Sequence, residues 1–178
     1  MPNHDSTPPS VANPPAQIRP ATAAAAAAIA AIYNHYITHT TITFEEAAID
    51  AAQMHQRIQE VNATALPWLV AESSGQVAGY CYASRWKGRC AYRFSVEITV
   101  YVQANLAARG VGTLLYQALF AELRRGPTHA VMAGIALPNA ASVALHQRFG
   151  LHKVAHFAQV GFKFEQWVDV GYWQLILK

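Results

Sequence analysis

Hydrophobic and polar residues alternate without a break from Tyr92 to Val102. This period of two predicts a strand whose even-numbered positions form an apolar face, with the odd-numbered positions on the other face. Glu97, Thr99 and Tyr101 lie on this second face, so their side chains should point the same way. We therefore expect the strand to present a carboxylate and two hydroxyl groups together.

A turn with two glycines and an amphipathic helix follow this strand. Apolar residues recur at helical spacing from about Gly112 to Arg125, and Gly126-Pro127 ends the pattern. The turn at Arg109-Gly110-Val111-Gly112 can expose consecutive backbone N–H groups at the start of the helix, which suits a phosphate or pyrophosphate group. Taken alone, such a turn serves packing about as often as ligand binding.

Two familiar phosphate-binding motifs do not match this turn. No Lys-Ser or Lys-Thr pair follows the second glycine, as the loop of a nucleoside-triphosphate site requires. The three-glycine pattern of a dinucleotide site, with an acidic residue about 20 positions on, is also absent. The turn therefore predicts a ligand other than ATP or NAD.

The rest of the chain predicts further strands and helices around this unit. Strands are expected at Ile18-Arg19, Trp68 to Glu72, Val77 to Ala83, Ala130 to Ile135, near Lys153 to Phe157 and near Val168 to Leu177, and helices at Thr22 to Ile37, Glu45 to about Val61 and about Ala140 to Phe149. The order β-α-α-β-β-β-α-β-α-β-β predicts an α/β fold, with a central mixed sheet flanked by about four helices. We expect one domain over residues 18–178, preceded by a disordered tail over residues 1–17, which contain five prolines.

Composition and charge narrow the class of protein. The 178 residues are 53% hydrophobic and 13% charged, enough for one domain with a substantial core. No apolar run is long enough for a membrane span, and the N-terminus lacks the features of a secretory signal, so we expect a cytoplasmic protein with two reduced cysteines. The net charge of +3 is modest and the cations are scattered, so neither nucleic acid nor a membrane is an expected partner.

Several motifs, in one order, resemble a known family. IRPAT stands at the start, TVYV precedes RGVGTLL, and LPNAASVALHQRFG follows. With the element order, these motifs resemble the GNAT superfamily of N-acetyltransferases over roughly Ile18 to Leu177. The phosphinothricin and methionine sulfoximine acetyltransferase branch is the more similar, on IYNHYI, WLVAE, WKGR-x-AY, VE-x-TVYV, LPN-x-x-S-x-x-LH and DVGYWQ.

This resemblance implies acetyl-CoA as the co-substrate and no metal. Its pantetheine amides would pair with the strand backbone at Val100, Val102 and Gln103. Its pyrophosphate would lie on the N–H groups of Arg109, Gly110, Val111, Gly112 and Thr113, where the helix dipole is favourable. Asn139 is either a helix N-cap or a cap that also meets the pantetheine. Ala107 stands where the family usually has Gln or Arg, so one side-chain contact to the cofactor is in doubt.

Two residues are candidates for proton transfer. Glu97 occupies the family's VE position and would act as the general base for the amine. The alternative for Glu97 is a salt bridge to Arg93, which is two positions back along the same strand face and four residues earlier in the sequence. His146 lies seven residues after Asn139, where many members have a tyrosine, and would protonate the departing thiolate. The alternative for His146 is a buried histidine hydrogen-bonded to the backbone.

Substrate recognition is assigned to the basic loop and the polar face of the strand. Lys87 and Arg89 could pair with the carboxylate, phosphinate or sulfoximine oxygens of a small amino acid, and Thr99 and Tyr101 face the reaction. The alternative is a solvated basic loop. We expect packing functions for Trp86, Tyr92 and Trp173, and we treat His35 and His39 as surface residues because no third metal ligand accompanies them.

The resemblance thus implies transfer of acetyl to the amino group of a small amino acid or analogue of the phosphinothricin, methionine sulfoximine or methionine sulfone type. Two alternatives stay open: a non-catalytic acyl-CoA-binding module, and an N-terminal acetyltransferase of peptides or proteins. A pure binding module would need neither Glu97 nor His146. A homodimer is expected by resemblance alone.

Overall fold

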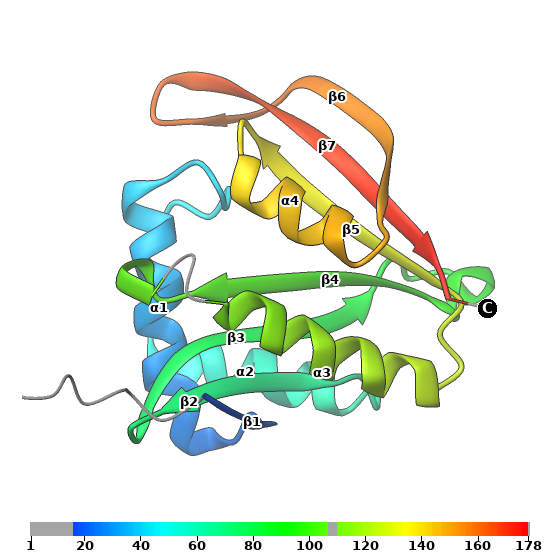
Figure 1. The fold of residues 1–178 in the computed structure, drawn as a ribbon. Coiled ribbons are helices and arrows are strands. Elements are labelled where there is room, and N and C mark those ends of the chain that lie inside the picture. The colour runs from blue at the N-terminus through cyan, green and yellow to red at the C-terminus, as the bar shows by residue number, and fades with distance from the viewer. Residues whose placement is uncertain (1–15, 107–109, 178) are drawn as a thin grey trace, which may run out of the picture.

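The computed structural model describes residues 16–106 and 110–177 of the chain. Seven strands form one mixed sheet in the order β1-β2-β3-β4-β5-β7-β6 (Figure 1). The strands are β1 (Gln17–Pro20), β2 (Trp68–Ser73), β3 (Gln76–Arg85), β4 (Ser95–Val102), β5 (Ala130–Leu137), β6 (His152–Lys163) and β7 (Gln166–Ile176). The helices are α1 (Ala26–His39), α2 (Ala51–Asn62), α3 (Val111–Arg125) and α4 (Ala140–Arg148). The predicted fold class, a mixed sheet with four helices, is confirmed.

The helices cover the two faces of the sheet and create two separate cores. Helices α3 and α4 lie on one face, and α1 and α2 lie behind the sheet in Figure 1. The first core contains the buried side of α3, including Leu115 and Phe120, packed on Val96 of β4. The second contains Ile29 of α1 and Tyr80 of β3. Even-numbered residues of β4 face the α3 core, as the alternation predicts, which leaves Tyr101 packed against the other core.

Strands β4 and β5 are paired over only three residues. Their parallel pairing joins Ser95–Glu97 to Ala130–Met132, although β4 continues to Val102 and β5 to Leu137. Beyond this stretch the two strands diverge, as Figure 1 shows. The sheet therefore has an interior edge where backbone groups of β4 are not paired with a neighbouring strand.

Several predicted boundaries differ from the structure. Helix α2 begins at Ala51 and not at Glu45, because Asp50 and Gln53 form a capping box: Asp50 Oδ1 accepts from the Gln53 N–H at 2.8 Å, and Gln53 Oε1 accepts from the Asp50 N–H at 2.9 Å. Strand β4 begins at Ser95, because Cys90–Tyr92 form a short 3-10 helix, η2. The first strand includes Gln17, which pairs with Glu72.

The hairpin of β6 and β7 is longer than predicted and contains an irregularity. The register between the strands shifts between Phe157 and Gly161. Within this bulge Gln159 has a φ of 51°, and its N–H donates to Asp169 Oδ1 at 2.8 Å. A bulge bends one strand against its partner and turns nearby side chains to new directions. Phe157 and Val160, at and within this bulge, line one pocket with Glu97 of β4 and Gly134 of β5.

No helix within residues 16–106 and 110–177 is long and apolar enough to cross a membrane.

Candidate functional site

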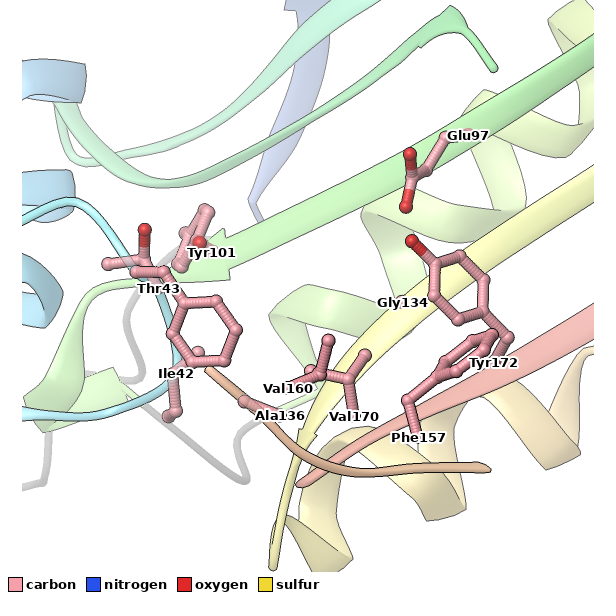
Figure 2. A pocket seen from close by; sticks show the side chains of 11 residues that line it. Ile42, Thr43, Glu97, Tyr101, Gly134, Ala136, Phe157, Val160, Val170 and Tyr172 are labelled. Carbon is pink, nitrogen blue, oxygen red and sulfur yellow. The ribbon is translucent and has the colours of Figure 1, made fainter. Parts of the chain in front are cut away.

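A cleft of about 520 Å³ lies beside the diverging end of β4 (Figure 2). Residues from four strands and one loop line it: Glu97 and Tyr101 of β4, Gly134 and Ala136 of β5, Val170 and Tyr172 of β7, Phe157 and Val160 of β6, and Ile42, Thr43 and Phe44 from the loop between α1 and α2. Most of these side chains are apolar. Glu97 is the only formally charged side chain among them.

The Glu97 carboxylate is held by one backbone group and one hydroxyl group. It accepts hydrogen bonds from the Gly134 N–H and the Tyr172 hydroxyl, and Figure 2 shows the Tyr172 hydroxyl facing it. Burial raises the pKa of Glu97 above its usual value of 4.5, while the Gly134 hydrogen bond, the positive charge of Lys87 and the Tyr172 hydrogen bond oppose this shift. A fixed carboxylate with a raised pKa is a better proton acceptor for an amine than an ordinary exposed one.

The alternative ion pair between Glu97 and Arg93 does not form in the described part of the chain. Arg93 precedes β4, so the two residues do not share a strand face. The Arg93 guanidinium lies over the Phe94 ring, 4.5 Å from its centroid, and Nη1 donates to the Cys90 carbonyl at 3.3 Å. Glu97 thus keeps its carboxylate directed at the cleft.

A second, smaller cleft of about 100 Å³ lies between β4 and β5 themselves. Its lining includes Thr99 and Val100 of β4 and Asn139, Ser142 and His146 at the start and along the side of α4. Tyr101 and Gly134 line both clefts. The two clefts therefore meet at the diverging edge of β4.

The register of β4 determines which of its backbone groups face this opening. Odd-numbered residues exchange hydrogen bonds with β3: Trp86 N–H donates to Ser95 O at 3.2 Å, and Gln103 N–H donates to Ala78 O at 2.8 Å. Even-numbered residues consequently direct their peptide groups toward β5, and Val100 and Val102 lie beyond the paired stretch. The Val102 carbonyl accepts from the Tyr36 hydroxyl at 2.5 Å.

The Val100 N–H and carbonyl and the Val102 N–H are therefore groups of β4 that could pair with an extended amide chain. The backbone groups of Gln103, also expected to contact the cofactor, have protein partners: its N–H donates to the Ala78 carbonyl at 2.8 Å, and its carbonyl accepts from the Leu106 N–H at 2.8 Å. An amide-bearing chain laid along Val100 would complete a strand-like pairing.

The start of α3 offers further donors. Gly110 is the N-cap of α3 and has a φ of 83°, a left-handed conformation that favours glycine. The first hydrogen bond of the helix runs from Leu114 N–H to Gly110 O. The N–H groups of Val111, Gly112 and Thr113 therefore have no acceptor within the helix. Arg109 and Ala107 lie outside the described residues. A Cβ at Gly112 would lie 3.2 Å from the Leu145 side chain, so this glycine also allows close packing of α3 on α4.

His146 is buried and both of its ring nitrogens have protein partners. Nδ1 lies 2.7 Å from the Ser142 carbonyl, which can only accept, so Nδ1 carries the proton. Nε2 then accepts from the Tyr116 hydroxyl at 2.8 Å. Burial lowers the pKa of His146, against the Ser142 hydrogen bond. Asn139 caps α4 by accepting from the Ser142 N–H at 3.1 Å, so it is an N-cap beside the small cleft.

Of the four residues assigned to the substrate, two line the clefts and two lie outside their lining. Tyr101 lines both clefts and hydrogen-bonds Thr43, whereas Thr99 lines the small cleft and hydrogen-bonds Tyr82. Lys87 is exposed, lies 5.2 Å from the Trp86 ring centroid and acts on Glu97 by its charge. Arg89 is exposed at the start of η2 and lines neither cleft. No group of three potential metal ligands occurs within the described residues.

Sequence reasoning missed several residues that line the clefts. Gly134 and Tyr172 are cross-strand partners in β5 and β7 and lie directly beside Glu97. A glycine within the apolar run of β5 is a signal of close approach that could have identified Gly134. Tyr116 and the loop residues Ile42 to Phe44 carried no comparable signal.

Comparisons with known proteins agree with this architecture. The chain is 40% identical over 160 residues to a phosphinothricin N-acetyltransferase of Streptomyces viridochromogenes, covering 90% of this chain and 87% of that protein. It is 36% identical over 160 residues to an L-methionine sulfoximine/L-methionine sulfone acetyltransferase of Salmonella typhimurium, covering 90% and 94%. A crystal structure of a GNAT phosphinothricin acetyltransferase from Sinorhizobium meliloti in complex with acetyl-CoA superposes with a TM-score of 0.87 at 30% identity, covering 90% and 88%.

The family model described as "Acetyltransferase (GNAT) domain" matches residues 18–171, which include every residue that lines the two clefts except Tyr172. The chain therefore belongs to the GNAT acetyltransferase family, and the resemblance seen in its motifs is confirmed.

Proposed function

We propose that this protein transfers an acetyl group from acetyl-CoA to the amino group of a small amino acid or amino-acid analogue. The observation that carries the proposal is the position of Glu97, a half-buried carboxylate at the junction of a large cleft and a strand edge with open peptide groups. The relatives named for phosphinothricin and methionine sulfoximine supply the substrate class.

The residues around the small cleft fit acetyl-CoA. The Val100 N–H and carbonyl and the Val102 N–H would hold the pantetheine amides, and the N–H groups of Val111, Gly112 and Thr113 would hold the pyrophosphate, with Gly110 shaping the turn. We propose Asn139 as a further contact from α4. Arg109 is retained from the sequence as a proposed contact. When bound, acetyl-CoA supplies an activated acetyl thioester.

Glu97 is the proposed general base. Its carboxylate would accept the proton that the attacking amine must lose, directly or through a water molecule. The Gly134 N–H and Tyr172 hydroxyl fix the carboxylate, which reduces the reorganisation needed when the proton arrives. Tyr101 and Thr99 are proposed to line the path of the amine along β4.

His146 remains the proposed proton donor to the thiolate, supported by its position on the small cleft. In its neutral form its proton is at Nδ1, on the Ser142 carbonyl, and Nε2 accepts from Tyr116. Donation through Nε2 therefore requires that Nε2 gains a proton first. That proton would have to come from solvent, because burial raises the pKa of Tyr116 well above its usual value and so opposes loss of its own proton.

Lys87 and Arg89 are proposed to attract the acceptor's acidic group from the loop before β4. Lys87 is the better supported of the two, because its charge already acts on Glu97. In this proposal the amine binds in the large cleft, and its acidic group points toward the basic loop.

We further propose a cytoplasmic homodimer. Strand β6 is the outer edge of the sheet, and the hairpin exposes large apolar residues: Val154, Phe157, Val160, Phe162, Phe164 and Trp167. A second copy would cover this surface, since exposed apolar patches of this kind are rare on monomers. Light scattering after gel filtration tests the dimer: a monomer mass at micromolar concentration contradicts it.

The test of the function is an acetyl-CoA-dependent thiol-release assay with phosphinothricin, methionine sulfoximine, methionine sulfone, free amino acids and short peptides. Turnover with the amino acids or analogues, and weaker turnover with peptides, is the expected result. Acetyl-CoA binding without turnover on any acceptor would favour a binding module. A preference for peptides would favour an N-terminal acetyltransferase.

A further inference from the structure

One wall of the large cleft has no regular secondary structure of its own. Ile42, Thr43 and Phe44 belong to the segment between α1 and α2, and all three line the cleft. Their position must therefore come from contacts with the rest of the fold. We call residues 42–44 the wall segment.

On its inner side the wall segment is tied to the aromatic core. The Thr43 hydroxyl lies 2.8 Å from the Tyr33 hydroxyl and also hydrogen-bonds Tyr101. Glu45, directly after the segment, accepts from Tyr33 at 3.0 Å and from Arg57 at 2.7 and 3.1 Å. These bonds fix the side of the segment that faces α1 and α2.

On its outer side the wall segment is tied to the hairpin of β6 and β7. Lys163, the last residue of β6, is 1% exposed, and its Nζ donates to the Thr43 carbonyl at 2.8 Å. A lysine buried to this extent is uncommon unless a specific contact requires it. Burial lowers the pKa of its ammonium group, while Glu46 and Glu45 oppose the shift.

Phe44 packs against Gly161, which lies on β6, the strand that also contains Lys163. A Cβ added at Gly161 would lie 2.3 Å from Cζ of Phe44, so the ring occupies the space that any other residue at position 161 would need. Gly161 has no left-handed φ, so backbone conformation does not explain the glycine. The ring of Phe44 does explain it, because the ring fills the space that a Cβ would need. The same ring also lines the cleft.

We propose that Lys163 and Gly161 are positioning residues that hold the wall segment against β6 and thereby determine acceptor binding. Neither residue lines the large cleft. They act through Thr43 and Phe44, so their substitution changes the acceptor side of the reaction and spares the acetyl-CoA side. This inference rests on the proposed function, because it assigns the large cleft to the acceptor.

The test uses methionine sulfone and phosphinothricin as acceptors and the full-length protein. Lys163→Met keeps the length of the side chain and removes the hydrogen bond, so we expect the acceptor KM to rise roughly tenfold. The acetyl-CoA KM and kcat should change by less than about twofold. Lys163→Arg restores a donor and should recover part of the loss. Lys153→Met, at an exposed lysine on the same strand, is the matched control and should leave the acceptor KM unchanged.

Gly161→Ala tests the contact with Phe44 independently. The added methyl group should push the ring into the cleft and raise the acceptor KM, more for phosphinothricin or methionine sulfone than for the smaller amino acid alanine. In a Phe44→Leu background the same substitution should have a much smaller effect, because the aromatic ring that the added methyl group displaces is no longer present. Gly126→Ala, where an added Cβ meets only an ordinary 3.7 Å contact, is the control.

Amide hydrogen exchange of residues 42–46, measured without any ligand, gives a readout separate from turnover. We expect faster exchange there in Lys163→Met and unchanged exchange in Lys153→Met. Equal rises in the KM of acceptor and acetyl-CoA, or a Gly161→Ala effect that persists in the Phe44→Leu background, would overturn the inference while leaving the proposed function intact. Failure of the wild-type protein to acetylate either acceptor or any free amino acid would overturn the proposed function, and the inference with it.

Discussion

The Glu97 carboxylate and Gly134 depend on each other across the point where β4 and β5 separate. Oε1 of Glu97 lies 3.1 Å from the position that a Cβ on residue 134 would occupy, and the Gly134 N–H donates to the same carboxylate. The ring of Tyr172 borders the same space, with Cζ 3.2 Å from that position. Only a glycine gives the carboxylate both its donor and its room.

Gly134→Ala is therefore expected to displace the carboxylate without unfolding the protein. The added methyl group crowds both Glu97 and Tyr172, so kcat with a good acceptor should fall by about tenfold or more. The affinity for acetyl-CoA, measured by calorimetry, should stay close to wild type. A parallel loss of cofactor affinity would show that the methyl group blocks the small cleft instead.

Glu97→Gln tests the general base directly. Glutamine keeps the size of the side chain and removes its ability to take a proton, so turnover should fall by on the order of 100-fold or more. Thermal stability and acetyl-CoA affinity should change little. If the rate is retained, another group must accept the proton from the amine.

Tyr172→Phe is expected to shift the pH dependence of the reaction. The Tyr172 hydrogen bond lowers the pKa of Glu97, so its removal leaves the burial effect less opposed and the pKa rises further. Because the base works in its ionised form, the acidic limb of kcat/KM should move to higher pH. The measurement is a pH–rate profile of the two proteins. A shift to lower pH, or no shift, would argue against Glu97 as the titrating base.

Gly110→Val should weaken acetyl-CoA binding. A β-branched residue is strained at a φ of 83°, and relief of this strain changes the direction of the N–H groups at the start of α3. We expect at least about a tenfold loss of affinity by calorimetry, corresponding to about 1.4 kcal/mol. Gly75→Val, at a φ of 75° and with open space around it, carries similar strain in the turn between β2 and β3. This control should lower stability and keep the affinity.

Arg89→Ala tests the basic loop. If Arg89 pairs with an acidic group of the acceptor, the KM for a carboxylate-bearing amine should rise more than the KM for its uncharged amide. The difference between the two rises should correspond to roughly 1.5 to 3 kcal/mol of lost binding free energy. Both acceptors are measured on the same variant, so general damage cancels. Equal losses would mean that the loop only shapes the entrance, which the exposed position of Arg89 would then explain.

Much of the fold follows from local patterns in the sequence. The alternation around Glu97 predicted which side chains of β4 share a face, and the two glycines predicted the start of α3. The predicted start of α2 at Glu45 was wrong, because the helix begins at Ala51. In the structure Glu45 binds Arg57 and Tyr33, and Asp50 supplies the cap.

The site was predictable only where its residues lie on one element. Tyr172 reaches Glu97 because β7 pairs with β5 in a register that places it opposite Gly134. Lys163 reaches Thr43 across 120 positions of sequence. Such contacts depend on strand order and on a bulge, neither of which leaves a local signal in one sequence. The availability of the Gln103 N–H likewise depends on its pairing with Ala78.

The alternation of side chains and peptide groups along β4 limits which insertions and deletions this strand can contain. Its odd-numbered residues Glu97 and Tyr101 line the large cleft, and its even-numbered peptide groups face the opening toward β5. An insertion of one residue between Glu97 and Val100 would exchange these two sets beyond the insertion, because neighbouring residues of a strand point to opposite sides. Tyr101 would then turn toward the α3 core, and peptide groups now bonded to β3 would face the opening. A substitution on this strand keeps the register of the other residues, whereas an insertion or deletion of odd length does not.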